Sequence, residues 1–140
     1  MNVYVDSSVV LRIVLGEPGA LTAWRRIRRA LSSQLVRLEC LRTIDRARIR
    51  LGLDDANIAD RRAAVLDVVE GFDLMPIDTA VLDRASNPFP TTLGTLDAIH
   101  LASALQARTQ IPDLHLATHN TDLATAARAL GFDVLGVATR

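Results

Sequence analysis

The segment Val3-Tyr4-Val5-Asp6-Ser7-Ser8 decides the fold class of this chain. Its first three residues are typical of a short buried strand. Asp6 follows directly, and Ser7 and Ser8 offer N-caps for an apolar helix that we expect to reach Leu15. A strand that is followed at once by a helix is the repeating unit of an α/β domain.

The rest of the chain repeats this alternation. Apolar spacing predicts further helices near residues 19–31, 37–51, 55–71, 79–85, 96–108 and 121–130. Short β-rich runs predict strands at residues 34–36, 74–77, 114–117 and 134–137. We therefore predict one α/β domain over residues 1–140, in three layers, with helices on both faces of a mostly parallel sheet of about five short strands.

One predicted helix has an apolar stripe that is expected to face the core. In the helix at residues 37–51 this stripe consists of Leu38, Leu41, Ile44, Ala47 and Leu51.

A second apolar surface surrounds Trp24 in the helix at residues 19–31, and this surface is larger than one core-facing stripe needs. We expect it to form a groove that binds a partner helix, the alternative being that it faces the chain's own core.

Composition excludes several classes of protein. Apolar residues make up 49% and charged residues 23% of the 140 residues, which excludes a disordered or fibrous chain. No run is long and apolar enough for a membrane span, and the N-terminus lacks the basic region of a signal peptide. We therefore expect a cytoplasmic protein that does not bind membranes. The single cysteine, Cys40, excludes an internal disulfide and a cysteine-based zinc cluster.

The net charge of zero conceals an uneven distribution. Residues 1–62 contain 12 basic and 7 acidic residues, whereas residues 63–140 contain 4 basic and 9 acidic residues. Every basic residue is an arginine. A coding bias toward arginine explains this, as does a basic surface suited to phosphate groups, and composition does not choose between them.

Acidic side chains, and one asparagine, lie where several strands are followed by helices. Asp6 follows the first strand, Glu39 and Asp97 lie in the first turns of two predicted helices, and Asn120 and Asp122 follow the strand at residues 114–117. Singly, each acid is explained by the favourable field at a helix N-terminus, or for Glu39 by a neighbouring arginine. Together, at the edge of a parallel sheet where ligands bind, they predict an acidic pocket for Mg²⁺.

Other catalytic constellations fail. The glycines do not form a phosphate-binding loop, and no nucleophile elbow surrounds Ser7 or Ser8. The three histidines lack the spacing of a zinc site. His100 lies three residues after Asp97, and we expect it to be a packed, hydrogen-bonded partner rather than a general base.

Four segments together resemble the PIN-domain nucleases, and more closely the VapC-type toxins of bacterial toxin–antitoxin pairs. They are Val3-Tyr4-Val5-Asp6-Ser7-Ser8, Leu38-Glu39, Leu96-Asp97-Ala98-Ile99-His100-Leu101-Ala102 and Ala117-Thr118-His119-Asn120-Thr121-Asp122. The resemblance spans the whole chain, and the segment around Asp97 is its most specific part. It implies a PIN-like α/β fold and an acidic Mg²⁺ site, with Mn²⁺ as the alternative ion, that cuts RNA.

Position by position, the resemblance implies that Asp6, Glu39 and Asp97 are the first three acids and the metal ligands. At the fourth position the family often has Thr-x-Asp, whereas this chain has Thr118-His119-Asn120 and an acid only at Asp122. We predict one tightly held Mg²⁺ on Asp6 and Asp97 with Glu39 near it, and a second site that is weak or filled only with substrate. Asp122 is the predicted fourth catalytic acid. The predicted supporting residues are Ser7, Thr118 and Asn120.

The substrate and partners follow from the same resemblance. Arg42, Arg46 and Arg50 share a helix face with Glu39, and this stripe either binds the RNA backbone or is simply solvated. VapC-type relatives imply a VapB-type antitoxin in the groove near Trp24, and a homodimer. The predicted function is a Mg²⁺-dependent endoribonuclease toxin. The alternatives are a housekeeping PIN nuclease in RNA processing and a non-catalytic module that binds RNA or protein.

Overall fold

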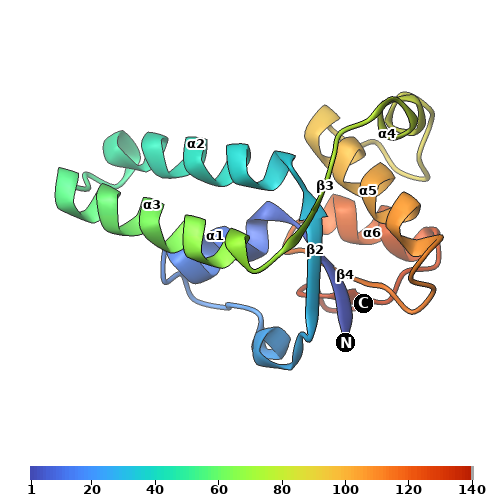
Figure 1. The fold of residues 1–140 in the computed structure, drawn as a ribbon, viewed down its shortest axis with the longest axis horizontal. Coiled ribbons are helices and arrows are strands. Elements are labelled where there is room, and N and C mark those ends of the chain that lie inside the picture. Colours follow the sequence, from blue (N-terminus) through green and yellow to red (C-terminus); the bar gives the residue numbers. More distant parts are fainter. Residues whose placement is uncertain (140) are drawn as a thin grey trace.

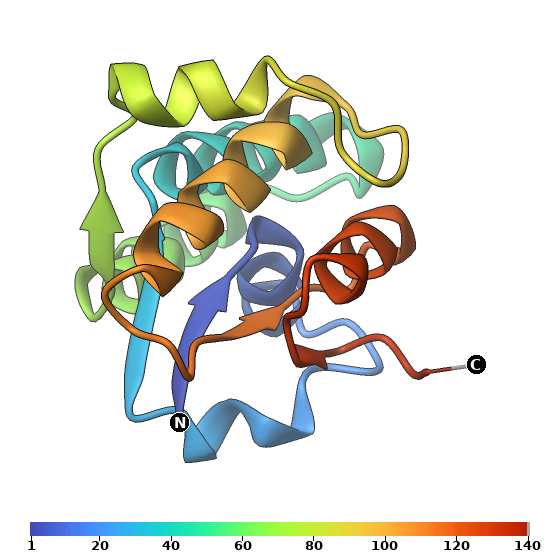
Figure 2. The same ribbon diagram turned by 90° about the vertical axis from the view of Figure 1, so that its right-hand side faces the viewer.

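The central sheet has five strands, all parallel, in the order β3-β2-β1-β4-β5. The computed structural model describes residues 1–139 (Figures 1 and 2). The strands are β1 (Asn2–Val5), β2 (Arg29–Ser33), β3 (Asp73–Met75), β4 (His115–Ala117) and β5 (Val134–Leu135). The helices are α1 (Ser7–Val14), the 3₁₀ helix η1 (Thr22–Arg26), α2 (Leu35–Arg50), α3 (Asp55–Glu70), α4 (Thr79–Ala85), α5 (Thr95–Arg108) and α6 (Thr121–Ala129).

The strand order reverses its direction of growth between β1 and β4. The chain adds β2 and then β3 on one side of β1, and crosses to add β4 and then β5 on the other side. Ligands of open α/β sheets bind beyond the carboxyl ends of the strands at this kind of switch point. Asp6, which follows β1, and Thr118, which follows β4, therefore occupy the expected place for a site.

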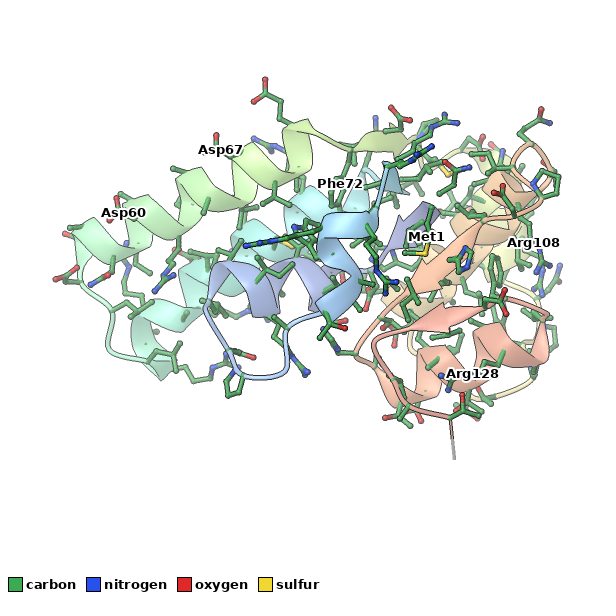
Figure 3. The ribbon with its side chains drawn as sticks, turned by 90° about the horizontal axis from the view of Figure 1, so that it is seen from below. Met1, Asp60, Asp67, Phe72, Arg108 and Arg128 are labelled. Carbon is green, nitrogen blue, oxygen red and sulfur yellow. The ribbon has the colours of Figure 1, made fainter. Side chains whose placement is uncertain are left out.

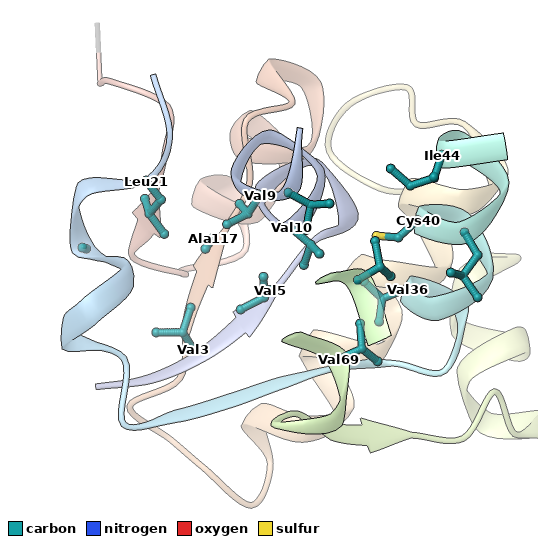
Figure 4. Close-up of a cluster of buried hydrophobic side chains, with 14 of the residues drawn as sticks. Val3, Val5, Val9, Val10, Leu21, Val36, Cys40, Ile44, Val69 and Ala117 are labelled. Atoms are coloured by element: carbon teal, nitrogen blue, oxygen red, sulfur yellow. The ribbon is translucent and has the colours of Figure 1, made fainter. Parts of the chain in front are cut away.

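Alternation along β1 divides the core between the two faces of the sheet. Val3 and Val5 pack with α1, α2, α3 and η1 in one cluster, part of which is drawn in Figure 4. Tyr4 points to the opposite face and packs with α5 and α6. The predicted fold class, with helices on both faces of a parallel sheet, is confirmed.

The helices α2 and α3 form a long pair that extends beyond one side of the sheet (Figure 1). Figure 3 shows the outer face of α3, on which Asp60 and Asp67 are exposed. Asp54 caps α3 by accepting a hydrogen bond from the backbone N–H of Asn57. Within residues 1–139, no helix combines the length and the apolar character needed to cross a bilayer.

Two predicted elements are wrong. Residues 19–31 do not form one helix: η1 covers only Thr22–Arg26, Ile27 is extended, and Leu31 belongs to β2. The predicted strand at residues 34–36 is the start of α2 instead, with Gln34 as its N-cap. The segment Arg29–Ser33 has no β-branched residue, so its strand conformation comes from pairing with β1 on one side and β3 on the other.

Two smaller predictions also need correction. The N-cap position of α1 is Asp6 rather than a serine, and its side chain makes no cap hydrogen bond. In α2 the buried face includes Leu41, Ile44 and Ala47, whereas Leu38 and Leu51 are exposed. The buried face also includes Leu35 and Val36, because α2 begins two residues earlier than predicted. Cys40 is buried on the same helix.

Gly136 makes a close backbone contact at the edge of the sheet, and we predict that replacing it is costly. Its φ is +99°, and a Cβ there would lie 2.3 Å from the carbonyl oxygen of Thr118. Gly136→Ala is expected to lower the free energy of unfolding by about 2 kcal/mol or more, measured by urea denaturation. Gly71→Ala is the matched control, because φ there is −78° and a Cβ would meet only ordinary contacts. Equal stability of the two variants would contradict this account.

Candidate acidic site at the sheet edge

Asp6 is the most deeply fixed acid of the site. Its side chain is buried, and Oδ2 accepts hydrogen bonds from Thr118 Oγ1 at 2.8 Å and from Ser8 Oγ at 2.7 Å. A weaker bond of 3.4 Å joins Ser7 Oγ to Oδ1. Ser8 Oγ in turn accepts from the backbone N–H of His119. The hydroxyls thus hold the carboxylate in place and connect the ends of β1 and β4.

Glu39, on α2, is linked to Asp6 by the buried side chain of His100. His100 Nε2 is hydrogen-bonded to Glu39 Oε1 and lies 3.6 Å from Asp6 Oδ1. Because Nε2 faces two carboxylates, which only accept hydrogen bonds, the contacts assign a proton to it. The other ring nitrogen, Nδ1, shares a hydrogen bond of 2.8 Å with Tyr4 Oη.

Tyr4, in the central strand β1, is the next residue in this chain of hydrogen bonds. Its hydroxyl oxygen accepts from the backbone N–H of Ser33, at the end of β2. Burial raises the pKa of Tyr4 far above its usual range, so the hydroxyl keeps its proton. The predicted role of His100 as a packed, hydrogen-bonded residue is confirmed, since its side chain is fully buried between Tyr4 and Glu39.

Asp97 approaches from the first turn of α5 and contacts Asn120. The amide Nδ2 of Asn120 donates to Asp97 Oδ2 at 2.8 Å. The amide oxygen of the same side chain accepts from the backbone N–H groups of Asp122 and Leu123, and so caps α6. Asn120 therefore orients Asp97, while its own oxygen is already used by the helix.

Burial and mutual repulsion set the electrostatics of the site. Burial raises the pKa of Asp97, and the charge of Asp6 raises it further. Burial lowers the pKa of His100, but the hydrogen bond that its Nε2 donates to Glu39 and the charges of the acids outweigh this effect, and the net shift is upward. Asp6 after β1 and Glu39 on α2 therefore both raise the pKa of Asp97 on α5.

Asp122 lies apart from these three acids. It is exposed in the first turn of α6, and within residues 1–139 its carboxylate takes part in no hydrogen bond or ion pair with them. The exposed position is the one expected of an acid in the field of a helix N-terminus. The expectation that Asp122 is a fourth catalytic acid is untested, and because of its exposed position we now expect Asp122 to be dispensable for cleavage.

The donor atoms suit a hard divalent ion that keeps much of its own water. Asp97 Oδ1 and Glu39 Oε2 make no hydrogen bond within the described part of the chain. In that same part, no group of three or more His, Cys, Asp or Glu side chains is positioned to hold a metal ion. Mg²⁺ is commonly bound by one or two carboxylates with several waters, and the arrangement fits that mode better than it fits a fully enclosed ion.

The arginine stripe divides along α2. Arg42 and Arg46 line a cavity of about 230 Å³ that also contacts Glu39 and Ser7. Arg50 is exposed at the last residue of α2 and does not line this cavity. Eleven residues of helix separate it from Glu39, a rise of about 16 Å.

Sequence reasoning missed two residues of the site. Tyr4 looked like an ordinary strand residue, and Ser8 like a helix cap. A polar group in the middle of an otherwise apolar strand was the available signal for Tyr4. For Ser8 the contact with Asp6 is local, but its contacts with Thr118 and His119, which are more than a hundred residues away, give no signal in the spacing.

Residues 3–129 match the sequence profile of the PIN domain family. The chain is 34% identical over 137 residues to Ribonuclease VapC46 of Mycobacterium tuberculosis, with 95% of each protein covered. It is 28% identical over 137 residues to Ribonuclease VapC47 of the same species, with 93% of each covered.

Two solved structures have a similar fold. One is a toxin–antitoxin complex from Klebsiella pneumoniae, with a TM-score of 0.62, 18% identity, and 99% of this chain and 97% of that chain covered. The other is the crystal structure of PAE2754 from Pyrobaculum aerophilum, with a TM-score of 0.61, 18% identity, and 96% and 83% covered. At these identities the similarity concerns the fold.

We predict that the Tyr4 hydroxyl stabilises the site. Tyr4→Phe keeps the buried ring but leaves the N–H of Ser33 and Nδ1 of His100 without their partner. The free energy of unfolding is expected to fall by about 1–3 kcal/mol, because unpaired buried polar groups are costly. Urea denaturation measures the change, and circular dichroism checks that the fold is retained. Unchanged or increased stability would contradict the hydrogen-bonded arrangement.

Proposed function

This chain belongs to the PIN domain family, as a VapC-type member, and on that premise we propose that it is a Mg²⁺-dependent endoribonuclease that acts as the toxin of a toxin–antitoxin pair. The observation that carries the proposal is the convergence of Asp6, Glu39 and Asp97 at the switch point of the sheet. Asp6 and Asp97 are the proposed main ligands of one Mg²⁺, with Glu39 near it. Mn²⁺ is the alternative ion.

The side chains have distinct tasks in this proposal. Asp6 is held by Thr118 and Ser8, so its carboxylate is preorganised for the ion. Asn120 orients Asp97, and His100 orients Glu39. The bound ion supplies polarisation of a phosphodiester and a lowered pKa for a coordinated water.

The resident carboxylates also explain why an ion is needed. The substrate backbone carries a negative charge at every phosphate, and the site contributes three carboxylates of the same sign. Without a cation, phosphate and carboxylates repel each other. A cation shared by Asp6 and Asp97 turns the same geometry into a binding site for phosphate.

We predict that Asp97 is essential for cleavage and that Asp122 is not. Asp97→Asn is expected to lower Mg²⁺-dependent cleavage of cellular RNA at least about 100-fold, because it removes a ligand charge. Asp122→Ala is the matched acidic control, and a loss of less than about tenfold is expected because its carboxylate is exposed and apart from the others. Initial rates across a Mg²⁺ titration measure both.

The result that would refute this assignment is cleavage by Asp97→Asn at the wild-type rate and with the wild-type dependence on Mg²⁺. A loss in Asp122→Ala as large as that in Asp97→Asn would place Asp122 among the ligands. Thermal melting with and without Mg²⁺ provides a second readout of ion binding that does not depend on activity.

The proposed protein partner is a VapB-type antitoxin that docks beside Trp24. A cavity of about 230 Å³ there is lined by Trp24, Ile27, Ala30, Val68 and Phe72, with Arg28 and Gly71. The rings of Trp24 and Phe72 are 6.1 Å apart. The groove lies between η1, β2 and the end of α3, not between helices alone as the sequence suggested.

The similar Klebsiella pneumoniae fold belongs to a toxin–antitoxin complex, which supports an antitoxin as the partner. A homodimer and a cytoplasmic location stay predictions.

We predict that a charge in this groove blocks the antitoxin and spares catalysis. Ile27→Asp is expected to weaken antitoxin binding at least about 100-fold, because a carboxylate would be buried against an apolar helix. Ile49→Asp on α2 is the control, since Ile49 is 90% exposed and α2 contributes no residue to the lining of the groove. Titration of the single tryptophan's fluorescence measures binding, and RNA cleavage measures activity. Equal binding by both variants would remove the antitoxin from this groove.

A further inference from the structure

We propose that the cavity beside Glu39 binds one unpaired nucleobase next to the scissile phosphate, an inference that rests on the proposed ribonuclease function. The cavity has a volume of about 230 Å³ and lies against the acidic site, since Glu39 itself is part of its wall. Its other walls include three leucines and two arginines. The leucines are the buried Leu35 and the exposed Leu38 and Leu96, and the arginines are Arg42 and Arg46.

Two of the leucines that line the cavity are exposed. Leu38 is 58% exposed and Leu96 is 48% exposed. Exposed leucines scattered singly over a surface need no explanation, but these two come from different helices and line one cavity. Each immediately precedes a proposed metal ligand in the chain, Glu39 or Asp97. An apolar pair is therefore fixed to the two helices that carry the acids.

The arginines supply the opposite chemistry on the same wall. Arg42 and Arg46 are exposed on α2, one helical turn apart, and within residues 1–139 neither forms an ion pair. Free guanidinium groups at this spacing suit a phosphate and its neighbour along a backbone. An apolar slot with two cations on its rim complements a nucleotide, which has an apolar base face and an anionic phosphate.

Size and composition point to a single base rather than a helix or a duplex. The cavity is smaller than the roughly 300–1,000 Å³ of sites for drug-sized ligands. Aromatic residues make up only 4% of the chain, and none of them lines this cavity. Aliphatic side chains also hold bases that have left the stack, so Leu38 and Leu96 can take the two base faces. RNA in a loop or single strand presents such bases, whereas a paired helix does not.

An abasic scan tests this site. Each nucleotide around a mapped cleavage position is replaced in turn by an abasic residue, and kcat/KM is measured with Mg²⁺. One abasic position is expected to reduce cleavage by the wild-type protein about tenfold. Leu38→Ala with Leu96→Ala is expected to cut the intact RNA about tenfold more slowly and to lose nothing further at that position. Both substitutions are on exposed helix positions and favour helix, so the fold is retained.

Matched controls separate this site from general effects. Leu51→Ala with Leu82→Ala removes two other exposed leucines and is expected to keep the wild-type response to every abasic position. Arg42→Gln with Arg46→Gln is expected to weaken cleavage of all substrates alike and to reduce its dependence on salt. Arg62→Gln, an exposed arginine on α3, is the control for charge.

The outcomes distinguish this inference from the function on which it rests. Cleavage by the wild-type protein that ignores every abasic position overturns the nucleobase site and leaves the ribonuclease function intact. A leucine variant that still loses tenfold at the critical position, or that loses only antitoxin binding, also overturns it, the latter assigning the cavity to a protein segment. Absence of Mg²⁺-dependent cleavage of the intact RNA overturns the function and this site together.

Discussion

The hydrogen bond from Thr118 Oγ1 to Asp6 Oδ2 joins the two strands between which the sheet changes its direction of growth. The carboxylate of a buried residue such as Asp6 is unstable unless it is paired or hydrogen-bonded, and here the hydroxyls of Ser8 on α1 and of Thr118 after β4 hold it. The rest of the site is built around this fixed anion. Gly136 contributes indirectly, because its lack of a side chain lets β5 pass close to the carbonyl of Thr118.

The other acids are brought to Asp6 by partners that are themselves buried or capped. Glu39 is held by His100, and His100 is supported by Tyr4 from the opposite side. Asp97 is held by Asn120, which also caps α6. Each acid is thus oriented by a different element. Asn120 occupies the position where the family often has an acid, and it donates a hydrogen bond to Asp97. An asparagine at this position leaves less negative charge for a second ion.

Much of the fold and of the site follows from the sequence, because strand-to-helix junctions and acids are local features. The junctions at Asp6 and Asn120, and the caps Asp54 and Asp78, are visible as patterns of a few residues. The strand Arg29–Ser33 is not, because pairing with two neighbours overrides its weak local preference. The contacts of Tyr4 with His100 and of Ser8 with His119 were equally invisible, because folding alone brings these residues together. The exposure of Leu38 beside Glu39 was not predicted either, because helical spacing alone placed Leu38 in the core.

We propose that Asp6 and Asp97 share one divalent ion at the switch point of the sheet. Anomalous diffraction from crystals grown with Mn²⁺ locates such an ion directly, without relying on activity. One strong peak is expected within coordinating distance of both carboxylates, with Glu39 adjacent to it, and the peak is expected to disappear in Asp97→Asn. A peak elsewhere on the protein, or an ion bound with equal occupancy in Asp97→Asn, would contradict it.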